Sequence, residues 1–333
     1  MDETIDEALL ERALDGAPPE IRERTHAWLH ADGHALIGMQ HPDYPSLLRR
    51  IPSPPAWLFV DGDPTKLWYP AIAIVGTRVP TPDGRDNARD FASAFARKGL
   101  SVTSGMAAGI DTAAHLGALD ESGATVAVLG TGIDVPFPSG NRRLMHHIAE
   151  TGVVVSEYAP GTQGAMHHFP LRNRIVAGLS LGTLVIEAAY RSGALITARL
   201  AVEAGREAFA LPGSVRNPMA RGCHRLLREG ATLVETPDDV LAALAPLAAV
   251  HAHDLRKRLH VPTSPRAASQ QGSPDMDVES KTLWDALGYD PTPMEALVAR
   301  TGLTAAKVAS ILLAMELGGR VVSEHGRYTR KSS

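Results

Sequence analysis

Short runs of β-branched and apolar residues alternate with longer helical segments through the middle of the chain, between residues 71 and 244. Connections of this length imply crossover units, because antiparallel hairpins need only short turns. Such units build a parallel sheet with helices on both faces. We therefore expect a doubly wound, mostly parallel α/β domain over residues 51–244. The predicted strands are Ala71–Val75, Ser101–Ser104, Thr125–Leu129, Val153–Ser156, Thr183–Ile186, Ala208–Leu211 and Thr232–Val234.

Different patterns flank this α/β region. Residues 1–50 carry apolar side chains at helical spacing in Ile5–Leu14 and Ile21–Leu29, which predicts a small helical module. Residues 245–278 lose periodicity and gather proline, glycine, serine and glutamine, which is typical of a flexible linker. We therefore expect two folded parts before the linker and a third after it.

Residues 279–333 follow the pattern of a winged helix-turn-helix. Helices are predicted over Ser280–Leu287, Pro293–Arg300 and Thr304–Leu317, and the alternating segment Arg320–Tyr328 predicts a hairpin. In such domains the third helix often enters a DNA major groove. The region holds seven basic and six acidic side chains, so its net charge is small. We therefore weigh a protein-contact role for this domain at least as heavily as the reading of DNA.

Composition excludes several classes of protein. The single cysteine, Cys223, leaves neither a disulfide framework nor a cysteine-based zinc cluster, and the histidines lack the spacing of a helix-borne metal site. No apolar run reaches the roughly 20 residues that span a bilayer, and the first residues are acidic rather than a basic signal segment. We expect a cytoplasmic protein with no metal and no membrane contact.

Positive charge is concentrated in one stretch of a chain whose formal net charge is −4. The segment from Arg172 to Arg228 holds nine arginines, no lysine and three glutamates. Arg174 opens a helix of small and apolar residues with few acidic neighbours, so a structural ion pair is not expected for it. The distribution indicates a local surface for an anionic ligand. A solvated face whose arginines pair internally stays open as the alternative.

Glycine-rich loops follow three predicted strands, at the edge where ligands bind in parallel α/β sheets. They are Gly76–Arg78, Ser104–Asp111 and Gly130–Asp134. Gly105 lets backbone amides approach an anion closely, and Asp111 can cap a helix that starts in its loop. The first loop lacks the Gly-x-Gly-x-x-Gly dinucleotide fingerprint, and the chain lacks a P-loop. We therefore expect no nucleotide cofactor.

Several long motifs recur at characteristic separations. They are Gly76–Arg78, Ser104–Asp111 with His115, Leu129–Asp134 with Pro138 and Asn141, Ser156–Glu157, Phe169–Ser180, Glu187–Ala188, Ser192–Arg199 and Leu211–Gly213. Together they resemble the DNA-processing protein A family (DprA, also called Smf). The resemblance covers about residues 40–240 in unbroken order, and the flanking parts match the accessory domains of the family more loosely. It implies an extended Rossmann-like central domain.

The resemblance implies a non-enzymatic protein that binds single-stranded DNA, protects incoming DNA during natural transformation and loads the RecA recombinase onto it. It also implies a homodimer without cofactors or catalytic residues. The DNA pocket of the family uses the Gly-Thr-Arg turn, the Ser-Gly loop and the Phe-Pro-x-Arg-Asn-Arg segment. Carried over by motif, the expected DNA-binding residues are Gly76, Thr77, Arg78, Ser104, Gly105, Phe169, Arg172, Asn173 and Arg174.

The chemistry of these side chains is compatible with that expectation. Guanidinium groups bind phosphate oxygens in two-point fashion, and we expect Arg78 and Arg174 to do so in one pocket. An exposed Phe169 would offer one base a stacking surface worth about 1–3 kcal/mol. A core position beside Pro170 is the alternative for this phenylalanine.

Two other functions stay open on the sequence. Nucleotide phosphoribohydrolases of the lysine-decarboxylase-like group also place a glutamate after a Gly-Thr pair, as Glu187 follows Gly182 and Thr183 here. The glutamate falls one residue late, and the glycine-rich half of that motif is missing. A winged-helix regulator with an α/β sensor domain would bind duplex DNA tightly and specifically, which the weakly basic third helix disfavours.

Overall fold

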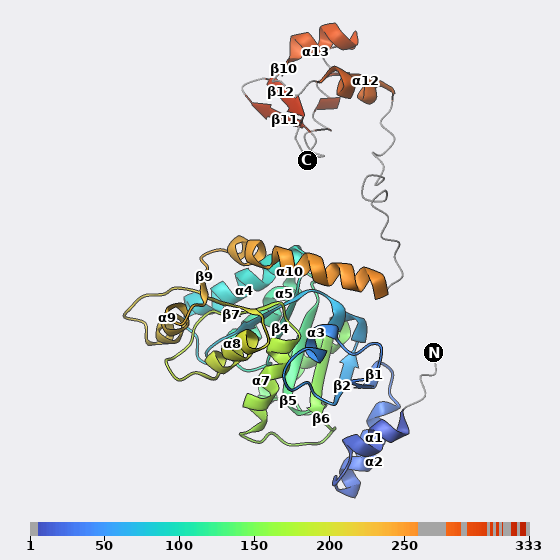
Figure 1. Cartoon of the computed structure of the whole chain (residues 1–333), viewed down its shortest axis with the longest axis vertical. Coiled ribbons are helices and arrows are strands. Elements are labelled where there is room, and N and C mark those ends of the chain that lie inside the picture. Colours follow the sequence, from blue (N-terminus) through green and yellow to red (C-terminus); the bar gives the residue numbers. More distant parts are fainter. Residues whose placement is uncertain are drawn as a thin grey trace. The chain divides into compact units, whose positions relative to one another are not determined.

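A computed structural model describes residues 6–258, 278–287, 292–304, 307–308, 311–312, 315, 321–324 and 327–330. The chain divides into two units, Met1–Leu259 and His260–Ser333. Each unit has buried apolar clusters of its own. Figure 1 labels most of the helices and strands of both units.

The first unit is built on a nine-stranded sheet in the order β1-β2-β6-β5-β4-β3-β7-β8-β9. The pairings β1–β2 and β2–β6 are antiparallel, and all the others are parallel. From β3 the chain winds outward through β4, β5 and β6, then in the opposite direction through β7, β8 and β9. The strands are β1 (His34–Gly38), β2 (Trp57–Gly62), β3 (Ala71–Val75), β4 (Ser101–Ser104), β5 (Thr125–Gly132), β6 (Val153–Tyr158), β7 (Gly182–Val185), β8 (Glu207–Ala210) and β9 (Thr232–Leu233).

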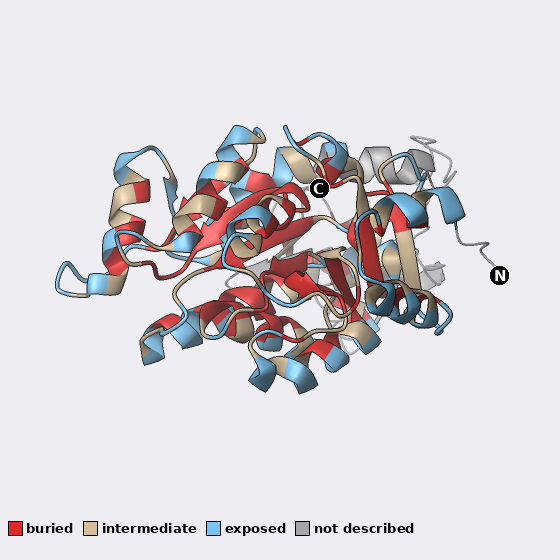
Figure 2. Ribbon diagram, turned by 90° about the horizontal axis from the view of Figure 1, so that it is seen from below, coloured by how far each residue is buried: buried red, intermediate tan, exposed pale blue. Residues whose placement is uncertain are grey.

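Helices cover both faces of this sheet, and Figure 2 shows the buried residues gathered on the strands and on the inward sides of the helices. Ala73 and Val75 of β3 belong to a buried cluster shared with α7, α8 and α9, whereas Ile72 and Ile74 belong to a cluster shared with α4, α5 and α10. This alternation along one strand is expected when both faces are covered. The helices are α4 (Pro82–Arg97), α5 (Ile110–Asp120), α6 (Arg142–Thr151), α7 (His168–Gly178), α8 (Gly193–Glu203), α9 (Arg221–Arg228) and α10 (Pro237–Arg258), with the short 3₁₀ helices η1 (Pro64–Trp68), η2 (Ser139–Asn141) and η3 (Pro218–Ala220).

The predicted fold class and all the predicted strands are confirmed, with small differences at the strand ends. Strands β1 and β2 were not among the predicted strands. Their pairing is antiparallel and of long range, as Phe59 of β2 lies opposite Ser156 of β6. Strands that extend a parallel sheet in this way break the alternation of strand and helix on which the prediction rested.

The N-terminal region differs from the helical module predicted over residues 1–50. Helices α1 (Glu7–Ala13), α2 (Pro19–Leu29) and α3 (Ser46–Arg49) are present, but His34–Gly38 is the edge strand β1 of the main sheet. Arg24 of α2 also forms an ion pair with Asp134 in the loop after β5, at 2.6 Å. The region is therefore part of the first unit.

Helix α10 continues past the predicted start of the linker. Residues 245–258 are helical, although Pro246 lies inside the helix. Leu247 and Ala248, beyond the proline, pack against the same buried cluster as Val240 and Leu244. The free energy gained by burying these apolar side chains exceeds the free energy lost with the backbone hydrogen bond that Pro246 removes. The rest of the predicted linker, residues 259–277, lies outside the described residues.

The second unit contains the helix and hairpin arrangement of a winged helix. Helices α12 (Val278–Ala286) and α13 (Met294–Thr301) match the first two predicted helices, and β11 (Val321–Glu324) pairs with β12 (Arg327–Arg330) as the predicted hairpin. The short strand β10 (Thr292–Pro293) completes a three-stranded sheet in the order β10-β12-β11. Much of the predicted helix over residues 304–317 lies outside the described residues.

Candidate functional site

The loops after β3, β4 and β5 meet the first turns of α7 and α8 at the carboxyl edge of the parallel strands. They surround a pocket of about 530 Å³. Strand order reverses direction between β3 and β7, and open α/β sheets bind ligands at such a switch point. Seven of the predicted site residues line the pocket: Gly76, Thr77, Arg78, Gly105, Phe169, Arg172 and Asn173.

Arg78 is an exposed cation on the turn that follows β3. The turn is fixed by its own backbone, because the Thr77 amide donates to the Glu187 carbonyl at 2.7 Å and the Val79 amide donates to Thr77 Oγ1 at 3.2 Å. Among the described residues, no carboxylate lies within ion-pair distance of Arg78. Its guanidinium carbon lies 5.8 Å from the centre of the Phe169 ring. This side chain is available to an anion.

Arg172 also lines the pocket, but it is a buried residue with 5% of its surface exposed. Its Nη1 donates to the carbonyls of Gly105 and Val128. A Cβ on Gly105 would come within 2.6 Å of the guanidinium, so only glycine permits this approach. Burial lowers the pKa of Arg172 to about 10, which leaves it charged at neutral pH. Arg172 therefore holds the loop after β4 in place, and its charge adds positive electrostatic potential to the pocket.

Two backbone amides of the loop after β4 are already engaged. Asp111 Oδ2 accepts from the Gly105 amide at 3.1 Å and from the Ala107 amide at 3.3 Å. Burial raises the pKa of Asp111, while the positive charge of Arg172 opposes that rise. Ser104 is fully buried outside the pocket lining, and its Oγ donates to the Ile74 carbonyl at 2.6 Å. We predicted that the Gly105 amide binds an anionic ligand. That prediction is wrong, because this amide already donates to the carboxylate of Asp111.

Arg174 lies outside the pocket lining. Its Nη2 pairs with both carboxylate oxygens of Glu157, at 2.6 Å each, and most of its side chain is buried. The expectation that this arginine lacks an acidic neighbour is wrong, because Glu157 comes from β6, distant in sequence. Arg172 and Arg174 stand two positions apart on α7 and so point to different sides of the helix. The structure therefore separates two arginines that the sequence placed together.

Two phenylalanine rings form one wall of the pocket. The centroids of Phe137 and Phe169 lie 4.9 Å apart with a tilt of 38°, and 44% of the Phe137 surface is exposed. Phe169 sits against Gly130, where a Cβ would come within 2.8 Å of the ring. The sequence prediction missed Phe137. The available signal was an aromatic residue in a glycine-rich loop that follows a parallel strand.

Asn173 connects the pocket to the start of α8. Its Oδ1 accepts from Arg172 Nε at 3.2 Å, and its Nδ2 lies 3.5 Å from the Gly193 carbonyl. Ser192, the residue before α8, caps the helix by accepting from the Ala194 amide at 3.2 Å. The N-terminal end of α8, with its partial positive charge, therefore also borders the pocket.

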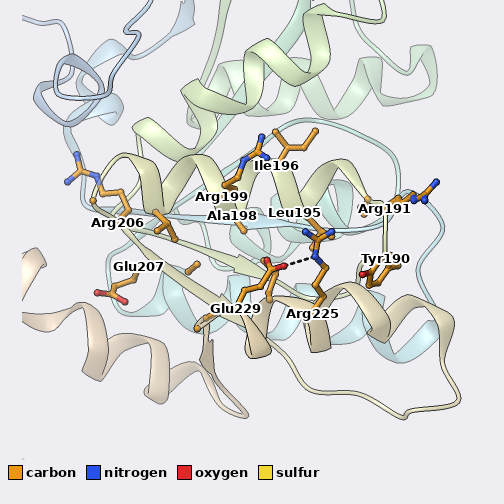
Figure 3. Close-up of a pocket in the computed structure, with 17 residues that line it drawn as sticks. Tyr190, Arg191, Leu195, Ile196, Ala198, Arg199, Arg206, Glu207, Arg225 and Glu229 are labelled. Carbon is orange, nitrogen blue, oxygen red and sulfur yellow. Dashed lines mark hydrogen bonds and ion pairs between the residues drawn. The ribbon is translucent and has the colours of Figure 1, made fainter.

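A larger pocket of about 750 Å³ lies on the other side of α8 (Figure 3). It is lined by four arginines of the basic stretch but by none of the predicted site residues. Two of these arginines are paired along their own helices: Arg225 Nε lies 2.7 Å from Glu229, and Arg199 Nε lies 3.4 Å from Glu203. The basic stretch is therefore divided between two pockets, and part of it is neutralised internally.

Other candidate reactive groups have structural roles. Glu187 accepts from the Thr81 amide and hydroxyl at 2.9 and 2.7 Å and from Asn217 Nδ2 at 3.0 Å. Burial raises the pKa of Cys223 to about 12, so its thiol stays protonated. Within the described parts of the chain, no helix is long and apolar enough to cross a membrane, and no three metal-ligating side chains form a group.

Comparison with known proteins gives matches to both units. The family model of DNA recombination-mediator protein A matches residues 35–245, and a model of the DprA winged helix domain matches residues 265–327. Protein Smf of Synechocystis is 38% identical over 312 residues, which is 87% of this chain and 78% of that protein. DNA processing protein DprA of Streptococcus pneumoniae is 46% identical over 199 residues, which is 60% of this chain and 70% of that protein.

Two solved structures are also similar. The X-ray structure of DprA from Streptococcus pneumoniae has a TM-score of 0.62 at 39% identity, over 70% of this chain and 86% of that one. DNA processing protein A from Helicobacter pylori, solved to explain its single-stranded DNA binding mode, has a TM-score of 0.57 at 29% identity, over 61% of this chain and 93% of that one. With a family model that covers well over half of its length, the chain belongs to the DNA recombination-mediator protein A family.

Proposed function

We propose that this protein binds single-stranded DNA in the pocket beside β3 and β7. The observation that carries the proposal is the exposed guanidinium of Arg78 next to the Phe137–Phe169 ring pair. Single-strand-binding proteins combine a cation for the phosphate with an aromatic face for the base, because every base has a face that can stack. The single-stranded DNA binding mode of the Helicobacter pylori relative supports the same class of ligand.

Each residue of the pocket then has a distinct task. Arg78 binds a phosphate through two N–H donors, and the charge of Arg172 below the loop attracts the strand without contacting it. The Asn173 amide group and the N-terminal end of α8 add neutral donors at the rim. Ser104 and Gly105 shape the loop after β4, and the ion pair of Arg174 with Glu157 holds α7 against β6.

We further propose a non-enzymatic mediator that works in the cytoplasm as a homodimer. It would protect incoming single strands during natural transformation and load the RecA recombinase onto them. Membership of the recombination-mediator family supports this role. The engagement of Glu187 by Thr81 and Asn217 leaves no free acid of the kind that a phosphoribohydrolase needs at this position. A monomeric mass in solution at micromolar concentration would contradict the homodimer.

Replacing Arg78 with alanine is expected to weaken binding to any single-stranded sequence roughly tenfold at low salt. Loss of one phosphate contact should also reduce the slope of log affinity against log salt by about 0.7. The measurement is fluorescence anisotropy of a labelled oligonucleotide over a salt titration. Arg97→Ala is the matched control, because it removes the same charge from an exposed pair with Glu121 at the far end of α4. Equal effects of both variants, or no single-strand binding by the wild type, would refute the proposal.

A further inference from the structure

Helix α2 lies outside the pocket lining but contacts two loops that line the pocket. The loop after β5 supplies Phe137 to the lining, and the loop after β6 (residues 159–167) supplies Met166. Helix α2 lies so close to the loop after β6 that a Cβ on Gly161 would come within 2.8 Å of Ile21 Cδ1. The first residue of this loop also packs against the apolar cluster that α1 and α2 share. The N-terminal helices are therefore in direct contact with segments that form the pocket.

Asp134 is the point at which α2 and the two loops meet. Its Oδ2 accepts from Arg24 Nε at 2.6 Å, and its Oδ1 accepts from the Gly161 amide at 2.7 Å. The two loops are joined a second time where the Gly132 amide donates to the Thr162 carbonyl at 2.8 Å. Only 18% of the Asp134 side chain is exposed, and both of its carboxylate oxygens accept hydrogen bonds. One carboxylate thus links α2 to the loop after β5 and to the loop after β6.

The two aromatic rings of the pocket depend on these loops. Phe137 follows Asp134 by three residues in the loop after β5, and 44% of its surface is exposed, so packing in the core does not fix its position. The loop after β6 lies against the other ring, because a Cβ on Gly164 would come within 3.2 Å of Phe169. The arrangement of the ring pair is therefore set by the two loops that Asp134 joins.

We propose that Asp134 is a positioning residue for the bound strand, through which α2 holds both loops in the arrangement that presents the ring pair to the DNA. The inference rests on the proposed function. Neither Arg24 nor Asp134 contacts the strand. When a smaller fraction of the molecules has its loops arranged for binding, the apparent affinity falls by the same factor. The N-terminal helices therefore set the affinity of a pocket to which they supply no contact.

The ion pair contributes little to the stability of the fold itself. Arg24 keeps 54% of its side chain exposed, and water and salt screen such pairs. The packing of α2 rests instead on apolar residues, since Leu29 and Ile21 belong to the cluster formed with α1. Loss of the Arg24 side chain should therefore free the Asp134 carboxylate from α2 and leave the helix folded.

Arg24→Ala tests the inference by fluorescence anisotropy with a labelled oligothymidine strand. Affinity at fixed salt is expected to fall roughly fivefold, whereas the urea midpoint of the first unit stays close to that of the wild type. The slope of log affinity against log salt should not change, because no phosphate contact is lost. Arg24→Lys, which keeps the charge, should recover most of the affinity. Arg22→Ala is the matched control, because it removes an arginine of the same helix that pairs with Glu11 of α1, and it should bind like the wild type.

Asp134→Ala should lower the affinity at least as far as Arg24→Ala does. Adding Arg24→Ala to it should cause no further loss, because both substitutions break the same link. Coupling between two sites is reciprocal, so saturation of the wild type with the same strand should slow hydrogen exchange at the backbone amides of α2. In Asp134→Ala the strand should leave that exchange rate unchanged.

Several results would overturn the inference. They are wild-type affinity in Arg24→Ala, equal losses in Arg24→Ala and Arg22→Ala, additive losses in the double variant, and α2 exchange that does not respond to DNA in the wild type. A salt slope reduced by about 0.7 in Arg24→Ala would also overturn it, because Arg24 would then bind a phosphate directly. All of these results leave the proposed function standing, since that is judged by the salt slope of Arg78→Ala. Absence of any wild-type single-strand binding would refute both.

Discussion

Replacing Arg172 with alanine is expected to lower the free energy of unfolding of the α/β unit by about 3–5 kcal/mol. The guanidinium is almost completely buried and donates to the carbonyls of Gly105 and Val128. Its removal takes a charged donor from two backbone groups and leaves the buried Asp111 without its nearby positive charge. It also opens a cavity below the loop after β4. All three effects lower the free energy of unfolding.

Urea unfolding followed by tryptophan fluorescence measures this loss, because Trp28, Trp57 and Trp68 all lie in the same unit as Arg172. The matched control is Arg199→Ala, which removes an exposed arginine paired with Glu203 on α8 and should cost less than about 1 kcal/mol. Similar losses in the two variants would mean that the buried guanidinium does not brace the loop.

Arg172 and Arg174 illustrate how far a sequence can define a site. The motif places both on the first turns of a helix next to a ligand edge, and the structure puts that helix where the motif predicts. The sequence does not reveal that Glu157 of β6 pairs with Arg174. Nor does it reveal that the absence of a side chain at Gly105 leaves room for the guanidinium of Arg172. Local pattern locates a site to within a helical turn, whereas the partner of each side chain depends on tertiary contacts.

The difference between local pattern and tertiary contacts also explains which strands and helices were predicted. Strands β3 to β8 were predictable because each is a short, mostly buried run between helices, and both faces of the sheet demand apolar residues. β1 and β2 depend on antiparallel pairing with β6, and the helical residues 245–258 depend on packing of Leu247 and Ala248. Phe137 was not predicted as a site residue. A single aromatic residue in a loop is exposed or buried according to the residues that pack around it, and the sequence does not specify those residues.

Lowering the pH from 7 to 5 is expected to destabilise the wild type by about 2 kcal/mol more than it destabilises His115→Asn. His115 is fully buried under the site, where burial and the charge of Arg172 lower its pKa to about 3. Its Nδ1 lies 2.7 Å from Thr125 Oγ1, whose proton goes to the Val102 carbonyl, so Nδ1 carries the donor hydrogen. Nε2 is buried without a partner, and a proton added there would meet no acceptor among the described residues.

The direction of this pH effect follows from the difference between the pKa of His115 in the unfolded and in the folded chain. The histidine takes up a proton below about pH 6.5 in the unfolded chain but only near pH 3 in the folded one, so stability is lost as pH falls through this window. Asp111 opposes the trend, because its raised pKa favours the folded state as pH falls. Asparagine keeps a donor towards Thr125 and does not titrate, so the difference between urea unfolding curves of the two proteins isolates His115. Parallel losses of stability in wild type and variant would show that the imidazole is not held neutral, and that the charge of Arg172 does not reach it.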